Sequence, residues 1–249
     1  MSSLRYLVVS DIHANIDAFE TVLDHATGAY DRVLVLGDLV GYGAEPNAVV
    51  DRIKALDPIA VIRGNHDKAA CGIDDGSAFN HVARVAAIWT GERLTAGNHD
   101  YLRALPMGPL EIDSLTEICH GAPFDEDHYI FDGGDAALAL RTAQHSLCLF
   151  GHTHLPALFK IVEGSLYGTA LDAERDAVIP LQRGARYLVN VGSIGQPRDG
   201  DPRAAYGVLD DEARELRTFR LPYPVEKAQK RIIDANLPVS LANRLAFGR

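Results

Sequence analysis

The sequence has no uninterrupted apolar run of about eighteen residues, the length at which a helix crosses a bilayer. The apolar run near its start, Leu7 to Val9, is also too short for the core of a signal peptide. Cysteine is scarce, since Cys71, Cys119 and Cys148 are the only three. A sparse, odd set of cysteines is typical of reduced thiols, so we expect a cytoplasmic protein without a membrane span.

Basic residues are in deficit, with 24 lysines and arginines against 34 aspartates and glutamates. The formal net charge is −10, and the chain contains no block of lysine or arginine. Such a charge repels the backbones of DNA and RNA and the headgroups of anionic membranes. We therefore expect neither non-specific nucleic-acid binding nor a membrane partner, while a homo-oligomer stays open.

The composition is 47% hydrophobic and 23% charged, which suits one large compact domain. No linker, internal repeat or low-complexity tract divides the chain. We therefore expect a single domain over residues 1–249. Within it, Phe79, Val82, Ala86 and Trp89 recur at helical spacing, which predicts a helical insertion at about residues 77–105.

The first part of the chain alternates strand and helix patterns. Apolar runs at 4–10, 33–36 and 59–62 predict strands, and helices are expected from Ile16 to Ala26 and from Pro46. This order predicts an α/β fold with a parallel sheet. The later part is more antiparallel: it has a hairpin at 110–119, a helix at 136–143, strands at 146–150, 157–162, 187–191, 204–209 and 216–221, and helices at 225–235 and 239–246.

Polar side chains follow the predicted strands where each one ends. Asp11 and His13 leave the first strand, and His152 and His154 repeat that spacing after residues 146–150. Single donors follow three other strands, namely Asp38, Asn65 and His120. Because ligands gather at the carboxyl ends of strands in an open α/β sheet, we expect all seven side chains to form one cluster.

Seven donors exceed what one metal ion with an open position needs. They suit two divalent metal ions about 3.5–4 Å apart, with one carboxylate shared between them. No cysteine is among them, which disfavours a structural zinc site. Imidazole and carboxylate together indicate Mn, Fe, Co, Ni or Zn, and the pattern does not separate these metals.

The donors fall in five sequence blocks: Asp-x-His, Gly-Asp, Gly-Asn-His-Asp, a lone His after a strand, and Gly-His-Thr-His. In this order the blocks resemble those of the calcineurin-like metallophosphoesterases, and they span Asp11 to His154. The resemblance implies a four-layer α/β/β/α sandwich of two mixed β-sheets with a dinuclear site at the strand carboxyl ends. It implies that Asp38 bridges the ions, that one ion is held by Asp11, His13 and His154, and that the other is held by Asn65, His120 and His152. It also implies that a metal-bound hydroxide attacks phosphorus in line, and that His66 protonates the leaving group as a general acid.

Two departures from the protein serine/threonine phosphatases of this superfamily are visible. Those enzymes carry Asp-Arg soon after the bridging aspartate, whereas Leu39-Val40-Gly41-Tyr42 follows Asp38 here. The carboxylate expected to orient His66 is therefore absent, and Asp67 replaces their glutamate. The chain is more similar to the small bacterial and archaeal phosphodiesterase or phosphatase branch.

Some residues carry competing interpretations. Gly97-Asn98-His99-Asp100 copies the block at 64–67, but no strand precedes it, so we expect Asn98 to cap a helix beginning at Tyr101. Cys119 is expected in the core, and Phe79 and Trp89 in the core or an interface. Candidates for substrate contact are Asn15, Tyr42 and Arg198, although a salt bridge from Arg198 to Asp199 or Asp201 is an equal alternative.

The leading hypothesis is a dinuclear-metal-dependent phosphodiesterase or phosphatase acting on small phosphoesters, with diesters favoured. The alternative is a nucleotide or dinucleoside polyphosphate hydrolase. A third hypothesis is a binding scaffold of the same fold without chemistry. A scaffold should lack ligands, and none of the expected ligands is missing here.

Overall fold

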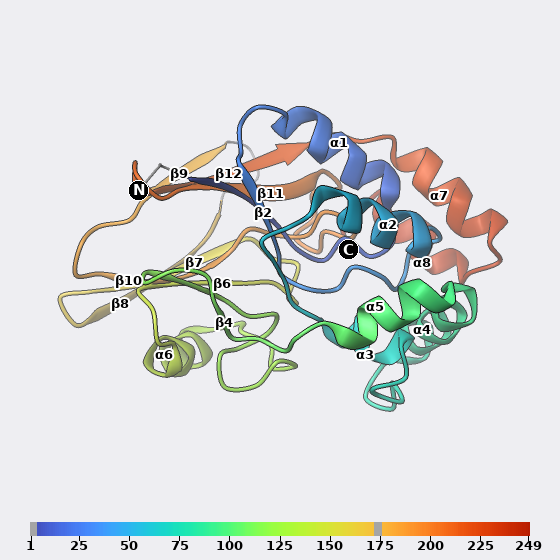
Figure 1. Cartoon of the computed structure of the whole chain (residues 1–249), viewed down its shortest axis with the longest axis horizontal. Helices are drawn as coiled ribbons and strands as arrows, with labels where there is room; N and C mark the ends of the chain where they lie inside the picture. Colours follow the sequence, from blue (N-terminus) through green and yellow to red (C-terminus); the bar gives the residue numbers. More distant parts are fainter. Residues whose placement is uncertain (1–3, 172–175) are drawn as a thin grey trace.

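Two six-stranded β-sheets stacked on each other form the centre of the molecule (Figure 1). The structure is a computed structural model, and it describes residues 4–171 and 176–249. The first sheet has the order β3 (Ala60–Val61), β2 (Arg32–Val35), β1 (Arg5–Val9), β11 (Ala204–Asp210), β12 (Glu215–Leu221) and β9 (Ala177–Pro180). The second has the order β4 (Leu110–Glu111), β5 (Thr116–Ile118), β6 (Leu147–Phe150), β10 (Arg186–Asn190), β7 (Ala157–Val162) and β8 (Ser165–Ala170).

Both sheets are mixed, as expected. The strands β1, β2 and β3 run parallel, and β11, β12 and β9 continue that sheet in antiparallel pairs. In the second sheet β5, β6 and β10 are parallel, while β4, β7 and β8 pair antiparallel. Parallel neighbours bring the carboxyl ends of their strands to the same edge of a sheet, which is where the candidate site lies.

Helices cover the outer faces of both sheets. Over the first sheet lie α1 (Ile16–Ala26), α2 (Pro46–Leu56), α7 (Val225–Asp234) and α8 (Val239–Leu245), and α6 (Gly133–Thr142) lies over the second (Figure 1). The short α3 (Asn65–Ala70) follows β3, and α4 (His81–Arg93) and α5 (Ala96–Ala104) pack beside it. The predicted four-layer α/β/β/α sandwich is confirmed.

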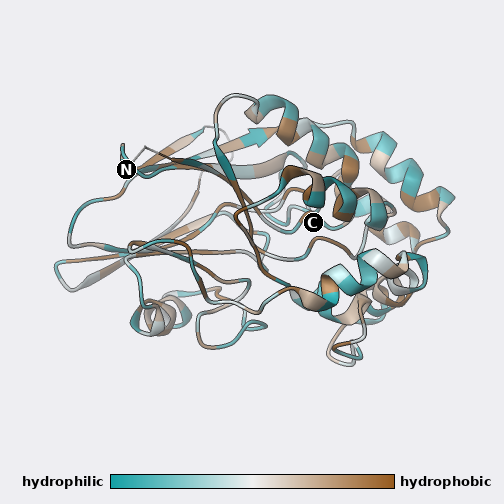
Figure 2. Cartoon of the chain, viewed as in Figure 1, coloured by the Kyte–Doolittle hydropathy of each residue, from teal (hydrophilic) through white to brown (hydrophobic). Residues whose placement is uncertain are grey.

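The period of two along β1 explains the layers. Leu7 and Val9 pack with the helices of the outer layer, whereas Tyr6 and Val8 pack against the second sheet. All four are buried, and burying such an apolar side chain stabilises the fold by about 1.5–3 kcal/mol. The apolar colour in Figure 2 accordingly follows the strands and the inward faces of the helices.

A third apolar cluster joins α6 to the outer face of the second sheet. Cys119 and Cys148 lie in it, both fully buried, with their Sγ atoms 3.5 Å apart. The predicted core role of Cys119 is confirmed, and all three cysteines are free thiols. Within the described residues no helix is both long and apolar enough to cross a membrane.

Several local expectations need correction. The strands β8 and β9 were not expected. All six residues of β8 are exposed and show no alternation of buried and exposed positions, and β9 is an edge strand of only four residues. The helix α5 begins at Ala96, earlier than the predicted Tyr101, and its N-cap is Thr95, whose side chain accepts from the Asn98 N–H. The prediction that Asn98 caps this helix is therefore wrong. The proposal of a single domain over 1–249 stays a prediction.

Candidate metal centre

All seven predicted ligands lie at strand ends that face one another across the two sheets. Asp11 and His13 follow β1, Asp38 follows β2, and Asn65 is the first residue of α3 after β3. From the second sheet, His120 follows β5, and His152 and His154 follow β6. Six of the seven are buried, and Asn65 is half-buried.

One group of donors consists of Asp11, His13, Asp38 and His154, with one ligand atom from each within 4.8 Å of the others. His154 Nε2 lies 3.1 Å from His13 Nε2 and 3.4 Å from Asp11 Oδ1. His13 Nε2 lies 3.6 Å from Asp38 Oδ2. These four atoms surround a single point, as the ligands of one ion do.

A second group consists of Asp38, His120 and His152. His120 Nε2 lies 3.4 Å from Asp38 Oδ2, the same oxygen that faces His13 in the first group. The other oxygen, Oδ1, accepts a hydrogen bond of 2.9 Å from the His66 N–H, whereas Oδ2 has no hydrogen-bond partner. Asp38 therefore belongs to both groups, and its Oδ2 faces both of them.

Main-chain carbonyl groups orient all four imidazole rings of the two groups. The contacts are His13 Nδ1 to Val40 O at 3.1 Å, His120 Nδ1 to Leu36 O at 2.8 Å, His154 Nδ1 to Gln196 O at 2.5 Å and His152 Nε2 to Asp127 O at 3.0 Å. A carbonyl oxygen only accepts, so the ring nitrogen facing it donates. In a neutral ring the other nitrogen then carries a free lone pair, which is the state that binds a metal.

The contact between His13 and His154 gives a direct test of whether a cation fits. Burial lowers the pKa of both rings well below the usual histidine value, so both are neutral near pH 7. Their lone pairs then face each other across 3.1 Å, which repels unless a positive ion lies between them. The buried Asn65 Oδ1 and His120 Nε2 also have no hydrogen-bond partner. The donors present therefore fit divalent metal ions.

The protonation of His120 also indicates a site for a positive ion. Burial lowers the pKa of His120, but the Asp38 carboxylate outweighs burial and raises that pKa to about 10. Burial lowers the pKa of His152 to about 3, so its ring is neutral near pH 7. A metal ion between Asp38 and His120 would take the place of the proton, because ligand histidines must be deprotonated.

The backbone at these ligands differs from the expected strand geometry. Five of the seven have a left-handed φ: Asp11 (52°), His13 (49°), Asp38 (53°), His152 (66°) and His154 (59°). Asp11 and His13 therefore converge through tight turns and not through the alternation of an extended strand. Such conformations cost on the order of 1–3 kcal/mol each in a non-glycine residue and cluster at functional sites.

Gly64 allows the block at 64–67 to lie against the shared carboxylate. A Cβ atom at this position would lie 2.1 Å from Asp38 Oδ1, and no side chain fits there. Asp67 fixes the same turn, accepting from the Gly64 N–H at 3.0 Å and the Val40 N–H at 3.1 Å. The block at 64–67 and the loop around Asp38 and Val40 therefore hold each other in position.

His66 is buried beside the metal groups and is held by aromatic contacts. Its ring stacks on Phe79 at 4.6 Å between centroids and lies 4.2 Å from Tyr42. Nδ1 has no hydrogen-bond partner among the described residues, which agrees with the missing Asp-Arg pair. Burial lowers the pKa of His66 to about 4, with Asp38 opposing.

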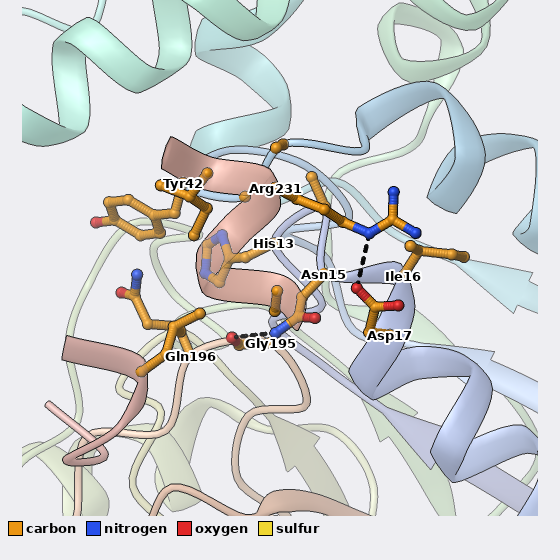
Figure 3. Close-up of a pocket in the computed structure, with 14 residues that line it drawn as sticks. His13, Asn15, Ile16, Asp17, Tyr42, Gly195, Gln196 and Arg231 are labelled. Atoms are coloured by element: carbon orange, nitrogen blue, oxygen red, sulfur yellow. Dashed lines mark hydrogen bonds and ion pairs between the residues drawn. The ribbon is translucent and has the colours of Figure 1, made fainter. Parts of the chain in front are cut away.

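The three candidates for substrate contact differ in how free they are. Asn15 caps α1 through Oδ1, and its Nδ2 donates to Gly195 O at 3.0 Å and to the Tyr223 hydroxyl at 3.2 Å. Figure 3 shows Asn15 turned toward Gly195 in a small pocket behind His13, where Arg231 pairs with Asp17. Both polar ends of Asn15 are therefore engaged inside the chain.

Arg198 is the freer group. One of its nitrogens, Nη2, lies 3.3 Å from the Tyr42 hydroxyl, and its buried Nε has no partner. The alternative salt bridge is absent, since Asp199 pairs with Arg220 and Asp201 with Arg203. The positive charge of Arg198 contributes to the lowered pKa of His154, so the guanidinium acts on the site itself.

A pocket opens onto the second group of donors. Its lining comprises Asn65, Lys68, Asp74, Ala78, Phe79, Asp127, Tyr129 and His152. The interpretation of Phe79 as only a core or interface residue is therefore incomplete, and Tyr129 was not considered. The one sequence signal for Tyr129 is its place in a polar, aromatic segment that follows His120.

The fold and the donor set define a metallophosphoesterase, and comparison with known proteins agrees. The family described as calcineurin-like phosphoesterase superfamily domain matches residues 4–214, so the chain belongs to that superfamily. It is thus a member of a family of phosphoric ester hydrolases. An uncharacterized protein of Methanocaldococcus jannaschii is 32% identical over 255 residues, 97% of each chain.

Two solved structures are similar over nearly their whole length. The crystal structure of a metallophosphoesterase from Sphaerobacter thermophilus is 37% identical with a TM-score of 0.87, and all of both chains is covered. A hypothetical protein from Pyrococcus horikoshii has a TM-score of 0.79 at 20% identity, with 98% of each chain covered. The second likeness shows the fold alone. The first likeness fits the small bacterial and archaeal branch expected from the sequence.

Proposed function

We propose that this chain hydrolyses small phosphoesters with the help of two divalent metal ions, and that it prefers diesters to monoesters. The observation that carries the proposal is Asp38 Oδ2, which faces His13 and His120 and so belongs to two groups of buried nitrogen and oxygen donors. In this proposal Asp38 bridges the ions, Asp11, His13 and His154 complete one set, and Asn65, His120 and His152 complete the other. The metals are Mn, Fe, Co, Ni or Zn.

When bound, the ions would supply an activated water as nucleophile and polarise the phosphoryl oxygens. The residues of the chain would attract and bind the substrate and donate a proton to the leaving group. Asp11 and Asp38 are the only carboxylates in the two sets, so two divalent ions leave the centre positively charged. That local charge attracts a phosphoester although the whole chain has a formal charge of −10.

Arg198 and His66 have separate roles beside the ions. Arg198 can bind a phosphoryl oxygen, because its guanidinium has no carboxylate partner and contacts the Tyr42 hydroxyl, Gln196 Oε1 and the Tyr129 side chain. His66 is the proton donor for the leaving alkoxide, and its unpartnered Nδ1 leaves it free to meet substrate. An incoming phosphate would raise the pKa of His66, which favours the protonated ring.

The alternative, a nucleotide or dinucleoside polyphosphate hydrolase, has one observation of its own. Arg198 and Arg244 each lie 5.9 Å from the centroid of the Tyr42 ring, and neither forms a salt bridge within the described chain. The charge of Arg198 contributes to the lowered pKa of Arg244, so the two guanidinium groups are neighbours. A second phosphate would suit this pair. The scaffold hypothesis has no such support, since the donor set is complete.

The test is reconstitution of metal-free protein with Mn, Fe, Co, Ni or Zn, followed by assays on phosphomonoesters, phosphodiesters and nucleoside polyphosphates. We expect two metal ions per chain and turnover highest on a diester. Turnover confined to polyphosphates would favour the alternative, and Arg244→Ala should then lose that activity selectively. Full metal loading without hydrolysis of any ester would contradict the proposed function.

A further inference from the structure

A group of ion pairs lies beside the second group of donors. Glu126 accepts two hydrogen bonds from Arg63, from Nε at 3.0 Å and from Nη2 at 2.9 Å. Lys68 Nζ contacts the same carboxylate at 3.0 Å and Asp127 Oδ2 at 2.6 Å. The side chains of Arg63, Glu126 and Lys68 are only 21%, 13% and 7% exposed, so water screens these three charges weakly. The four residues together are called the ion network.

One side of the ion network holds the candidate ligand Asn65. Arg63 directly precedes the block at 64–67, and Lys68 directly follows it on the short helix α3. The two cations therefore flank Asn65 in the chain, and both contact the Glu126 carboxylate. Asn65 Oδ1 itself has no hydrogen-bond partner among the described residues. Its position therefore depends on the segment that carries it, which the two cations tie to Glu126.

The other side of the ion network holds the candidate ligand His152. The Asp127 main-chain carbonyl accepts from His152 Nε2 at 3.0 Å, which leaves Nδ1 for a metal ion. The Tyr129 ring, two residues further on, stacks on the same imidazole with 3.8 Å between centroids. The segment from Asp127 to Tyr129 therefore supports the His152 ring both at its edge and on its face.

The same segment also lies against the loop of the third candidate ligand, His120. The Gly121 N–H, directly after His120, donates to the Glu126 main-chain carbonyl at 3.1 Å. A Cβ atom at position 121 would lie 2.6 Å from that oxygen, so this close approach requires glycine. Glu126 and Asp127 thus contact the segments of all three ligands assigned to the second ion.

The ligands assigned to the first ion alone are held by other parts of the chain. The His13 ring is oriented by Val40 O and the His154 ring by Gln196 O. Within the described residues, no hydrogen bond or ion pair joins the ion network to Asp11, His13 or His154. A change in the ion network should therefore affect one ion site and not the other.

We propose that the ion network positions Asn65 and His152 for the second metal ion and thereby sets the affinity of that site alone. The inference rests on the proposed dinuclear phosphoesterase and adds positioning residues to one of its two sites. A ligand set that is already held in place loses little conformational freedom when the ion binds. Removing an outer partner of a metal ligand typically costs about 10–100-fold in metal affinity.

The sign of the charge effect separates positioning from simple attraction. Arg63 and Lys68 are cations beside a site for a cation, and Lys68 lines the same pocket as Asn65 and His152. If charge alone mattered, removing either positive charge would strengthen the binding of a metal ion. If the two cations hold the ligands in place, removing either one weakens it. The two explanations therefore predict opposite changes.

The experiment titrates the metal-free protein with Mn²⁺ by isothermal calorimetry and measures a Kd for each ion. Asn65→Ala removes a ligand of the second ion, so the step that remains in this variant belongs to the first ion. Lys68→Met and Arg63→Met should each raise the second Kd by about 10-fold or more and leave the first Kd unchanged.

Two further variants act as controls. Lys68→Arg keeps the positive charge and its hydrogen-bond donors, and it should restore the second Kd. Arg52→Met removes a cation of a different ion pair, that of Arg52 with Glu20 at 2.9 Å between α2 and α1, and it should change neither Kd. Electron paramagnetic resonance of the Mn-loaded variants gives a second readout, because two neighbouring Mn²⁺ ions are magnetically coupled and a single ion is not.

A second Kd that is unchanged or lower in either Lys68→Met or Arg63→Met would overturn the inference. An equal rise of both Kd values would also overturn it, since that result reports a general loosening of the fold. If one of the two variants does not fold, the other decides the question. Binding of fewer than two ions by the wild type would refute the dinuclear proposal itself, so the two failures are distinguishable.

Discussion

At the scale of single residues, Asp38 contacts both groups of candidate ligands and the backbone of His66. Its Oδ1 accepts from the His66 N–H, and its Oδ2 faces His13 and His120. Burial raises the pKa of Asp38, but the charge of His120 and its hydrogen bond to the carboxylate, with smaller contributions from other histidines, hold that pKa well below its usual range. The carboxylate is therefore ionised near pH 7, as a bridging ligand must be.

Asp38→Asn should lower the affinity for both ions, because it removes one of only two carboxylates in the donor set. The loss should exceed the about 10–100-fold that removal of an outer-shell partner costs. Elemental analysis after dialysis against limiting metal measures it, with Asp100→Asn, on the exposed part of α5, as the matched control. Two ions per chain retained by Asp38→Asn would refute the bridging role.

His66 separates metal binding from proton transfer. His66→Ala should keep both ions but lose about 10²–10⁴-fold in rate, the usual range for a positioned proton donor. The loss should be largest on an alkyl diester, whose alkoxide needs the proton, and smaller on a nitrophenyl ester. His99→Ala, in the copied block, is the control and should change neither. Metal loss would make His66 a ligand, and equal losses on both esters would remove the proton-donor role.

At the scale of elements, two identical blocks of four residues have different fates. Gly64-Asn65-His66-Asp67 follows β3 and begins α3, whereas Gly97-Asn98-His99-Asp100 lies inside α5. Asn98 is buried and donates from Nδ2 to Asn47 Oδ1 at 3.1 Å and to Asp51 Oδ1 at 2.9 Å. The preceding element, and not the motif, decides which block reaches the site.

Asn98→Ala should therefore affect stability and not turnover. It removes the hydrogen bonds from Asn98 to Asn47, Asp51 and Lys54 on α2, and we expect the free energy of unfolding to fall by about 1–3 kcal/mol. Asn65→Ala should show the opposite: a small change in stability and nearly complete loss of activity with one ion less per chain. Denaturant unfolding and initial rates on the same two variants test this, and reversed results would show that β3 is wrongly assigned.

At the scale of the whole molecule, the site ties the two sheets together. Asp11 and Asp38 follow strands of the first sheet, and His120 and His152 follow strands of the second. The sheets otherwise meet through an apolar interface of buried side chains. Metal ions that bind only the folded arrangement must stabilise it by mass action.

Metal addition should therefore raise the melting temperature of the metal-free protein. At a free metal concentration 100 times Kd, the gain is about 2.7 kcal/mol per site. Differential scanning calorimetry with and without chelator measures it, and Asp38→Asn should show a much smaller shift. An unchanged melting temperature in the wild type would mean that the ions do not distinguish folded from unfolded chain.

Much of the fold followed from local patterns. Apolar runs that end in Asp, Asn or His predicted β1, β2, β3, β5 and β6 with their ligand loops. The hairpin of β4 and β5 and the closing helices were also predicted. The misses were β8 and β9, because an exposed edge strand is stabilised by its partner and not by its own pattern. The start of α5 was missed because the Thr95 cap was overlooked.

The sequence by itself determined the family and the fold class and predicted the seven donors, because these depend on residue type and order along the chain. Only the tertiary structure decided which ring nitrogen faces the site and that Asp38 Oδ2 is common to both groups. It also decided that the polar atoms of Asn15 are engaged within the chain, whereas Arg198 contacts only uncharged groups. Those facts depend on contacts between distant segments, such as His152 with Asp127 and Arg198 with Tyr42. The stacking of Tyr129 on His152 is of the same kind, since the two residues are 23 positions apart in the sequence and only the fold brings their rings to 3.8 Å.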